Sequence, residues 1–395
     1  MAKIINLKPY KDFFKSESTG GILLMLCVVV SLIIANSGIG NNFNNLLSTK
    51  IGFENSVIDL RYSILLWIND GLMAIFFLMV GLEIKRELVE GELSSIKQAS
   101  LPIIAAIGGM LVPACIYIIL DSSAQTGHGW GIPMATDIAF AIAILSILGS
   151  KVPNSLKVFL TALAIVDDLG AILVIALFYS NEIHFEYLLY SGAIMVLLIA
   201  FNYFGVKKLA FYIIPGILMW YFIHHSGIHA TIAGVLTALT IPTNATDNAS
   251  PLEKLEHLLV KPVNFIIMPL FAIANTNIRF ESEMLNNITS GLSIAIICGL
   301  LIGKPLGILS FSWLSVKLKI SKLPQTATWA QIGGLGLLGG IGFTMSIFIA
   351  LLSLPQPEYQ TQAKFSILIA SVCAGILGYS VLKFLGKSKK RMILK

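Results

Sequence analysis

Apolar stretches of about twenty residues recur along this chain, and they restrict its fold more than any other feature. Twenty residues of α-helix rise about 30 Å, which matches the hydrocarbon core of a bilayer. Hydrophobic residues make up 56% of the 395 residues and charged residues only 12%, whereas a soluble domain usually carries about 25% charged residues. The sequence therefore predicts an all-α polytopic membrane protein and excludes a soluble two-domain enzyme.

Twelve transmembrane helices are predicted, within a single transmembrane domain over 1–395. They lie at 20–36, 63–82, 100–120, 131–149, 155–179, 185–204, 208–223, 226–241, 258–275, 290–315, 328–352 and 362–386. With the N-terminus inside, 22 of the 27 Lys and Arg residues fall in inside segments and four fall outside. This bias is the one that the positive-inside rule expects, so both termini are predicted to be cytoplasmic.

The net charge of +6 follows from the same asymmetry and requires no nucleic-acid partner. The basic tail "KSKKRMILK" is expected to face solvent and anionic headgroups, which makes membrane lipid a predicted partner.

Two predicted spans contain residues that interrupt a helix. The fourth reads "GWGIPMATDIAF", with a proline just ahead of Thr136 and Asp137. The eleventh reads "GLLGGIGFTMS", with Gly339, Gly340 and Gly342 near its centre. A glycine costs about 1 kcal/mol relative to alanine in a helix interior, so a cluster of glycines favours unwinding. Both spans are predicted to be discontinuous, although a glycine packing seam would give the same pattern.

The interrupted spans occupy equivalent places in two triples of helices, 100–180 and 290–386. Each triple has its interrupted helix in the middle. The first triple starts from the cytoplasm and the second from outside, so their topologies are opposite. We therefore predict two inverted three-helix repeats, with a functional site where the discontinuous helices cross.

Four charged residues are predicted at one depth in the membrane: Asp137, Asp167, Asp168 and Lys304. Lys304 is the one basic residue that the topology cannot place near a membrane surface. Neighbouring residues on a helix point about 100° apart, so one of the adjacent aspartates can pair with Lys304 while the other faces a cavity. Intramembrane carboxylates usually mark ion or proton paths. A purely structural ion-pair network is the alternative.

The segments "ATDIAFAIAIL", "ALAIVDDLGAI", "LLIGKPLGI" and "GIGFTMSIFIA" resemble the signatures of NhaA-type bacterial Na⁺/H⁺ antiporters, a family that is itself a standard example of inverted-repeat transporters. The similarity includes "LLWINDGLMAIFFLMVGLEIKREL" and "SGIHATIAGV", so it covers nearly the whole chain. Met134 departs from the family, in which a smaller residue is usual.

The resemblance implies a secondary transporter rather than an enzyme, located in the bacterial inner membrane. It would export Na⁺ or Li⁺ electrogenically in exchange for H⁺ by alternating access, with activation at alkaline pH and no cofactor. Such exchange would serve sodium and pH homeostasis.

The resemblance also implies roles for the charged centre. Asp168 would be the principal carboxylate that binds the transported Na⁺ and exchanges protons, with Asp167 as its neighbour. Lys304 would pair with Asp167, and Thr136 and Asp137 would lie at the unwound crossing. The chemistry agrees, because a hard cation such as Na⁺ prefers oxygen ligands. A proton and Na⁺ would then compete for the same carboxylate.

Six further residues are implied in pH sensing by the resemblance: Glu83, Arg86, Glu87, His229, Glu256 and His257. Two simpler readings stay open. Glu83 and Glu87, one turn apart, are also typical of a solvated helix end, and His229 could be a histidine packed against Ser or Thr.

The outer segment "STKIGFENSVIDLRYS", within 45–63, alternates apolar and polar residues as a short β-hairpin does. Because an isolated hairpin is only marginally stable, pairing with a second copy would help. The resemblance suggests a homodimer through this element.

Two other functions fit parts of the pattern. A channel or a different ion-coupled transporter would also place charged residues in the membrane. An intramembrane aspartyl protease would use two membrane aspartates, but on separate helices that share a proton. Asp167 and Asp168 are adjacent on one helix, and the sequence contains no Gly-x-Gly-Asp motif.

Overall fold

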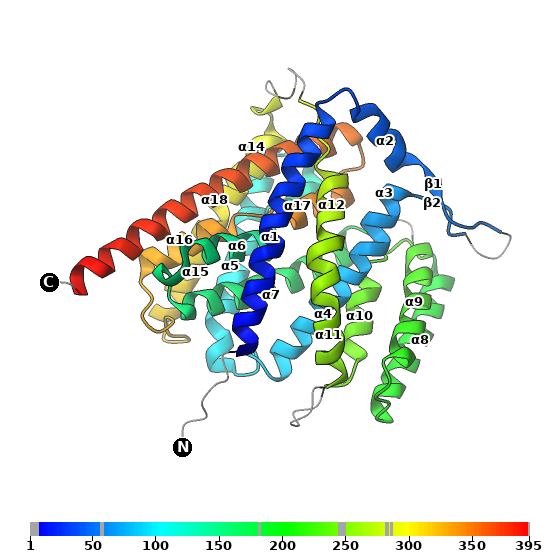
Figure 1. Ribbon diagram of the computed structural model, residues 1–395, viewed down its shortest axis with the longest axis horizontal. Helices are drawn as coiled ribbons and strands as arrows, with labels where there is room; N and C mark the ends of the chain where they lie inside the picture. The colour runs from blue at the N-terminus through cyan, green and yellow to red at the C-terminus, as the bar shows by residue number, and fades with distance from the viewer. Residues whose placement is uncertain are drawn as a thin grey trace.

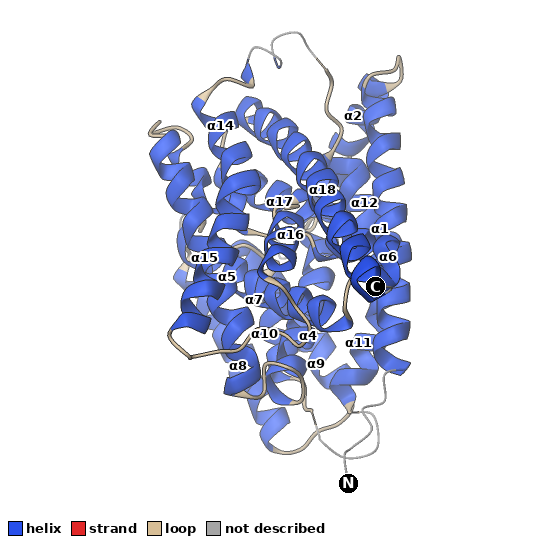
Figure 2. Cartoon of the chain, turned by 90° about the vertical axis from the view of Figure 1, so that its left-hand side faces the viewer, coloured by secondary structure: helices blue, strands red, loops and turns tan. Residues whose placement is uncertain are grey.

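A computed structural model of the chain describes residues 8–55, 59–180, 183–243, 250–280, 284 and 287–393. The described residues form a bundle of helices with one small two-stranded sheet (Figures 1 and 2). Eight helices are long and apolar enough to cross a membrane, or up to ten if each of two bent pairs counts as one span. These helices confirm the prediction of a polytopic helical membrane protein. The side chains of the basic tail lie outside the described residues.

The helices follow one another along the chain with few long connections. They are α1 (Lys8–Ala35), α2 (Gly40–Ser48), α3 (Ile64–Leu66), α4 (Met73–Val89), α5 (Ile96–Leu120), α6 (Ile138–Leu148), α7 (Asn154–Phe178), α8 (Phe185–Tyr203), α9 (Ala210–His225), α10 (Ile232–Thr240), α11 (Pro251–Pro262), α12 (Met268–Asn275), α14 (Gly291–Cys298), α15 (Lys304–Lys317), α16 (Trp329–Gly339), α17 (Phe343–Ser353) and α18 (Pro357–Ile393).

Tighter or wider helical turns join several of these helices. The described residues include three π-turns, η1 (Trp67–Leu72), η4 (Val263–Ile267) and η5 (Gly299–Gly303), and two 3₁₀-helices, η2 (Gly127–Met134) and η3 (Gly149–Lys151). Each of the twelve predicted segments overlaps at least one helix. However, α10 has nine residues and so rises only about 14 Å. The number of complete crossings therefore stays a prediction.

Both predicted interruptions are present. The 3₁₀-helix η2 ends at Met134, and α6 begins only at Ile138 after an extended stretch. The helices α16 and α17 meet at a bend of 47° around 340–342. Figure 2 shows α16 and α17 at the centre of the bundle, close to α7. The two broken segments therefore place irregular backbone inside the protein, where it can be satisfied without lipid contact.

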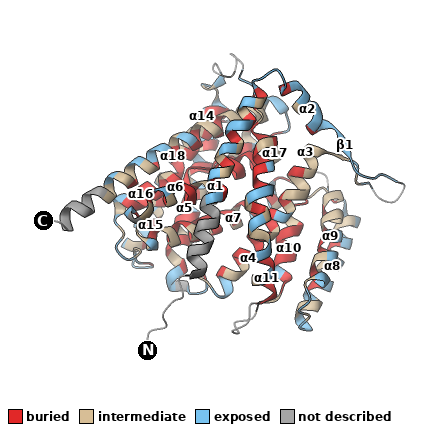
Figure 3. Ribbon diagram, in the orientation of Figure 1, coloured by how far each residue is buried: buried red, intermediate tan, exposed pale blue. Residues whose placement is uncertain are grey.

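Close packing between helices depends on small residues. The helix α5 runs along α15, where a Cβ added to Gly307 would lie 2.1 Å from the carbonyl oxygen of Gly108. Such a distance leaves room only for glycine, as is common where membrane helices approach closely. Buried residues concentrate in the central helices, whereas α8 and α9 pair at the edge and expose much of their surface (Figure 3).

The predicted β-hairpin is present but short. β1 (Lys50–Ile51) pairs antiparallel with β2 (Tyr62–Ser63), and a further bridge joins Glu54 to Asp59. Residues 45–48 belong to α2, so the strands begin later than the predicted range of 45–63. Residues 56–58 of that range lie outside the described residues. The two strands extend away from the bundle (Figure 1).

Candidate ion-binding site

The two broken segments cross and are joined by hydrogen bonds between their backbones. The amide of Asp137 donates to the carbonyl of Ile341 at 2.6 Å. Ser346 Oγ on α17 donates to the carbonyl of Ile132 on η2 at 2.7 Å. Each broken segment therefore satisfies polar backbone groups that the other leaves unpaired.

Asp137 lies at the N-termini of two helices at once. Its Oδ1 accepts from the amide of Phe140 at 3.1 Å and caps α6. Its Oδ2 accepts from the amide of Thr344 at 3.0 Å and from the hydroxyl of Thr344, near the start of α17. Helix N-termini carry partial positive charge, so one carboxylate offsets both.

Lys304 lies where the other two half-helices end. Its Nζ donates to Asp167 Oδ2 at 2.6 Å, and both side chains are completely buried. Nζ also donates to the carbonyl of Met134, the last residue of η2. Thr136 Oγ1 lies 2.7 Å from Asp167 Oδ2 and 2.9 Å from the carbonyl of Gly339, the last residue of α16. A hydroxyl has one proton, so Thr136 donates to one of these acceptors at a time.

Asp168 is buried beside this pair, with 2% of its surface exposed. Its Oδ1 has no hydrogen-bond partner among the described residues, and neither has Oδ1 of Asp167. The described residues also give Asp168 no ion pair. Buried polar atoms without a partner are rare and call for an explanation. Two anionic oxygens from adjacent residues are the type of ligand that a hard cation prefers.

These two carboxylates do not belong to a cluster of metal ligands. Among the described residues, no group of three or more His, Cys, Asp or Glu could hold a metal ion. A cation at Asp167 and Asp168 would need further oxygens, which the Thr136 hydroxyl and carbonyls of the broken helices could supply.

The three glycines of the eleventh predicted span allow close contact rather than unusual dihedral angles. The φ angles of Gly340 and Gly342 are −71° and −92°, which any residue can adopt. A Cβ on Gly340 would lie 2.4 Å from the carbonyl oxygen of Leu300, and one on Gly342 would lie 2.1 Å from Ser346 Oγ. A Cβ on Gly339 would lie 2.9 Å from Ile308 Cδ1. The eleventh predicted span is therefore both interrupted and closely packed at its glycines.

A second charged cluster lies near the end of α4. Arg86 Nε lies 3.0 and 3.1 Å from the two carboxylate oxygens of Glu256 on α11. Its Nη1 lies 3.0 Å from Glu87 Oε1. Glu83, one turn earlier, is buried, and its Oε1 has no hydrogen-bond partner among the described residues. His257, the next residue after Glu256, is exposed and makes none of these contacts. The structure thus brings together four of the six residues expected to sense pH.

His229 lies apart from that cluster, in the turn between α9 and α10. Its Nε2 is 2.6 Å from the carbonyl of Tyr179, just after α7. The hydroxyl of Tyr179 in turn accepts from the amide of Gly131 in η2 at 3.1 Å. His229 is therefore a hydrogen-bonded, half-buried histidine that connects the α9–α10 turn to α7.

Sequence reasoning missed several polar contacts. Asn275 donates its amide to Asn69 Oδ1 at 2.7 Å, which connects α12 to η1. Asp70 Oδ2 lies 3.2 Å from His224 Nδ1 on α9. The polar pair "ND" inside the apolar "LLWINDGL" was the available signal. Thr344 was also missed, although it follows the glycine break by two residues.

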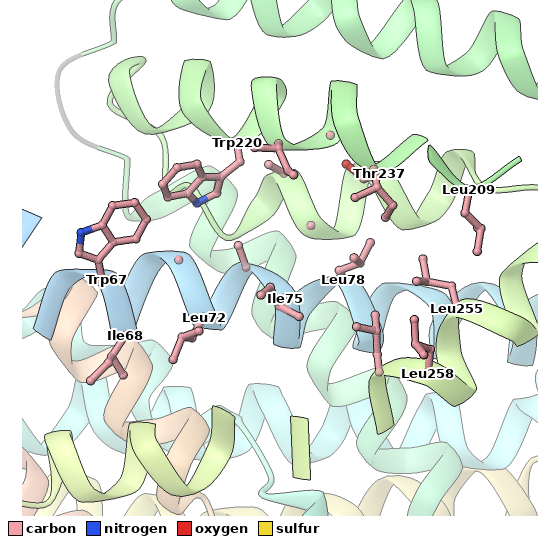
Figure 4. A pocket seen from close by; sticks show the side chains of 18 of the residues that line it. Trp67, Ile68, Leu72, Ile75, Leu78, Leu209, Trp220, Thr237, Leu255 and Leu258 are labelled. Atoms are coloured by element: carbon pink, nitrogen blue, oxygen red, sulfur yellow. The ribbon is translucent and has the colours of Figure 1, made fainter. Parts of the chain in front are cut away.

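A large cavity lies elsewhere, between α4 and the helices α9, α10 and α11 (Figure 4). Its volume is about 750 Å³. Trp67 and Trp220 lie at one end, and Leu209 and Leu258 lie toward the other. Its lining includes no ionisable side chain. It therefore lacks the charged oxygens that a small cation needs and is separate from the candidate ion site.

Fold and site together define a multi-pass helical membrane protein with a buried charged centre at the crossing of two discontinuous helices. The family model for Na⁺/H⁺ antiporter 1 matches residues 11–382. The chain belongs to that family.

Curated relatives agree over nearly the full length. The chain is 64% identical to Na⁺/H⁺ antiporter NhaA 2 of Flavobacterium johnsoniae, over 99% of this chain and 96% of the relative. It is 51% identical to Na⁺/H⁺ antiporter NhaA 2 of Aliarcobacter butzleri, over 96% of this chain and 97% of the relative. It is 46% identical to Na⁺/H⁺ antiporter NhaA of Escherichia coli, over 95% and 98% respectively.

Proposed function

We propose that this chain is an electrogenic Na⁺/H⁺ antiporter that exports Na⁺ or Li⁺ in exchange for protons by alternating access. One observation carries the site assignment. Oδ1 of Asp167 and Oδ1 of Asp168 are buried without partners among the described residues, directly beside the Lys304–Asp167 ion pair. Membership of the Na⁺/H⁺ antiporter 1 family supports the choice of ions.

Exchange follows from competition at this site. Asp168 is the principal ligand of the transported cation, with Asp167 beside it, and Thr136 contributes its hydroxyl. A proton that binds Asp168 removes the charge that holds Na⁺, so the two ions occupy the site alternately. Lys304 holds Asp167 in place while Na⁺ is absent. No resident cofactor takes part.

Net charge movement couples exchange to the membrane potential. A cycle that imports more than one proton for each Na⁺ gains about 2.3 kcal/mol per net charge at 100 mV. This energy drives Na⁺ export against its gradient and supports sodium and pH homeostasis.

The Glu83–Arg86–Glu87–Glu256 cluster is proposed to sense cytoplasmic pH, with His229 and His257 as further contributors. The dense packing of carboxylates around one guanidinium supports this role, because proton uptake there would change the contact between α4 and α11. Activation at alkaline pH follows if loss of those protons is required for transport.

We further propose the placement of the chain in the membrane. It crosses the inner membrane of a bacterium twelve times with both termini in the cytoplasm, as the distribution of Lys and Arg supports. The segments 100–180 and 290–386 form two inverted repeats, each with one broken helix. Asp137 is placed at the crossing of these helices, where it offsets the helix ends. A homodimer forms through the short β1–β2 hairpin.

Na⁺-driven proton movement in proteoliposomes, followed with a pH-sensitive dye between roughly pH 6.5 and 8.5, tests the proposal. Na⁺ and Li⁺ should move protons, K⁺ should not, and Asp168→Asn should abolish the signal. Asp121→Asn is the matched control. Asp121 is also buried, and one of its carboxylate oxygens has no partner within the described ranges, but it lies at the end of α5.

Either of two results would redirect the assignment. Equal activity of Asp168→Asn and wild type would make Asp168 structural. A cation flux that is indifferent to a pH gradient would indicate a channel rather than an antiporter.

A further inference from the structure

The span that carries Lys304 is not a regular helix. Between α14 and α15, the π-turn η5 ends immediately before the lysine, and the amide of Lys304 donates to the carbonyl of Gly299, five residues earlier. A π-turn adds one residue to the helical turn, and each residue turns the helix by about 100°. The direction in which Lys304 points therefore depends on this turn.

Gly299 is also the point where this turn contacts the broken fourth span. A Cβ on Gly299 would lie 2.7 Å from Pro133 Cβ and 2.9 Å from Pro133 Cγ. The pyrrolidine ring cannot rotate away as a flexible side chain could. Met134, whose carbonyl accepts from Lys304 Nζ, is the next residue. The spacing between Gly299 and Pro133 therefore sets how closely the lysine approaches its acceptor.

Another glycine fixes the opposite end of the same turn. A Cβ on Gly303 would lie 2.8 Å from Pro113 Cα on α5. The π-turn is thus held between two prolines of different helices. Of these two glycine contacts, the one at Gly299 joins the turn to the segment that contains Met134 and Thr136.

We propose that Gly299 and Pro133 are positioning residues: their contact sets the π-turn against η2 and so aligns Lys304 with Asp167 and the Met134 carbonyl. Neither residue touches the transported ion. The inference rests on the proposed function, because it assumes that the Lys304–Asp167 pair takes part in exchange.

A double-mutant cycle tests the contact. Gly299→Ala should raise the apparent KM for Na⁺ by about tenfold or more and displace the pH profile, because misplacement of a reacting group by 1 Å can cost about 100-fold. Pro133→Gly alone, which removes both the Cβ and the ring, should have a smaller effect. In Gly299→Ala/Pro133→Gly the loss of the Pro133 Cβ and ring leaves space for the added methyl, so KM and pH profile should return to those of Pro133→Gly.

Gly216→Ala is the matched control. It adds one methyl group at similarly close range, 2.8 Å from Thr237 Cγ2 between α9 and α10, away from the charged centre. It should affect the yield of folded protein or its thermal midpoint but leave the KM and pH profile unchanged.

The outcomes separate this inference from the proposed function. Unchanged KM and pH profile in Gly299→Ala, or no recovery in the double variant, would overturn the positioning role. If Gly299→Ala does not accumulate, the double variant Gly299→Ala/Pro133→Gly decides. Its normal accumulation and transport would support the contact, whereas its failure to accumulate while Pro133→Gly accumulates would overturn the contact. Absence of Na⁺-driven proton movement in the wild type would instead contradict the proposed function.

Discussion

The buried charged centre at the helix crossing, called the deep centre below, contains Asp137, Asp167, Asp168 and Lys304. The second cluster, at the end of α4, contains similar groups but is more exposed. Each contains a cationic side chain that pairs with a carboxylate on another helix. In the part of the chain that the structure describes, each also has a nearby buried carboxylate oxygen without a hydrogen-bond partner. In the deep centre both partners, Lys304 and Asp167, are completely buried. In the second cluster the side chains of Arg86 and Glu256 are 25% and 9% exposed.

This difference determines how much each charge depends on its partner. A fully buried ion pair has lost its hydration, so removal of one partner leaves an uncompensated charge that water cannot reach. A partly exposed pair retains water as a substitute. The deep pair is therefore expected to be required for folding and transport, whereas the second cluster can change its protonation without such a cost. This contrast suits an ion site and a sensor, respectively.

The largest expected contrast is in transport. Asp168→Asn should abolish Na⁺-driven proton movement, because it removes the negative charge beside Asp167. Glu83→Gln, the equivalent change in the second cluster, should alter the rate by only about fivefold, at the low end of allosteric coupling, and displace its pH dependence. Dye-based transport assays across pH check both. Similar losses in the two variants would contradict the division of roles.

The next largest contrast is expected in how much each cluster contributes to the free energy of unfolding. Lys304→Met should lower the free energy of unfolding by about 3–5 kcal/mol, because it leaves Asp167 charged and buried. The double variant Lys304→Met/Asp167→Asn should recover most of the lost free energy of unfolding. Arg86→Met should cost only about 1 kcal/mol. Thermal unfolding in detergent measures all three, and failure of the double variant to recover would mean that the charge itself is not the cause.

A smaller effect is expected at the helix crossing. Thr344→Val removes the hydroxyl donor to Asp137 Oδ2 but keeps the amide donor, so it should cost about 1 kcal/mol. Thr344→Ser keeps both donors and should remain within a few tenths of a kcal/mol of wild type in the same thermal assay. A loss in Thr344→Ser as large as that in Thr344→Val would mean that the methyl group contributes to stability as much as the hydroxyl does.

The smallest expected difference between the two clusters is in how their contribution to stability responds to salt. Raising the ionic strength from about 0.1 to 1 M shortens the Debye length from about 10 to 3 Å. The stability difference between wild type and Arg86→Met should therefore shrink with choline chloride, which avoids Na⁺ binding. The difference between wild type and Lys304→Met should stay constant, because the deep pair is not screened. An equal salt response in both would mean that water reaches the deep centre.

Much of the architecture could be predicted because it depends on local composition. Apolar length identified the helical segments, and the glycine cluster and the Thr136–Asp137 region indicated the two breaks. The adjacent aspartates and Lys304 were singled out by their cost in an apolar segment. The boundaries of some elements were predicted less well. The helix α10 is shorter than its predicted span, and residues 45–48 belong to α2 rather than to the hairpin.

The contacts that complete the site could not be predicted in the same way. The lysine binds a backbone carbonyl 170 positions away, at Met134, and a carbonyl has no signature in the sequence. Thr344 reaches Asp137 across 207 positions. The π-turn before Lys304 and the Asp70–His224 contact likewise depend on how distant helices pack.

The sequence by itself determined that this chain forms membrane helices, that two of them break, and that four charged residues lie within apolar segments. These properties follow from transfer free energies and helix propensities, which act residue by residue. Only the tertiary structure decided that Lys304 also donates to the Met134 carbonyl, that Asp137 caps two helices and that Oδ1 of Asp168 has no partner among the described residues. The reason is that a charge buried among helices takes its partner from whichever residues packing brings within hydrogen-bond distance, and those residues are far apart in the chain.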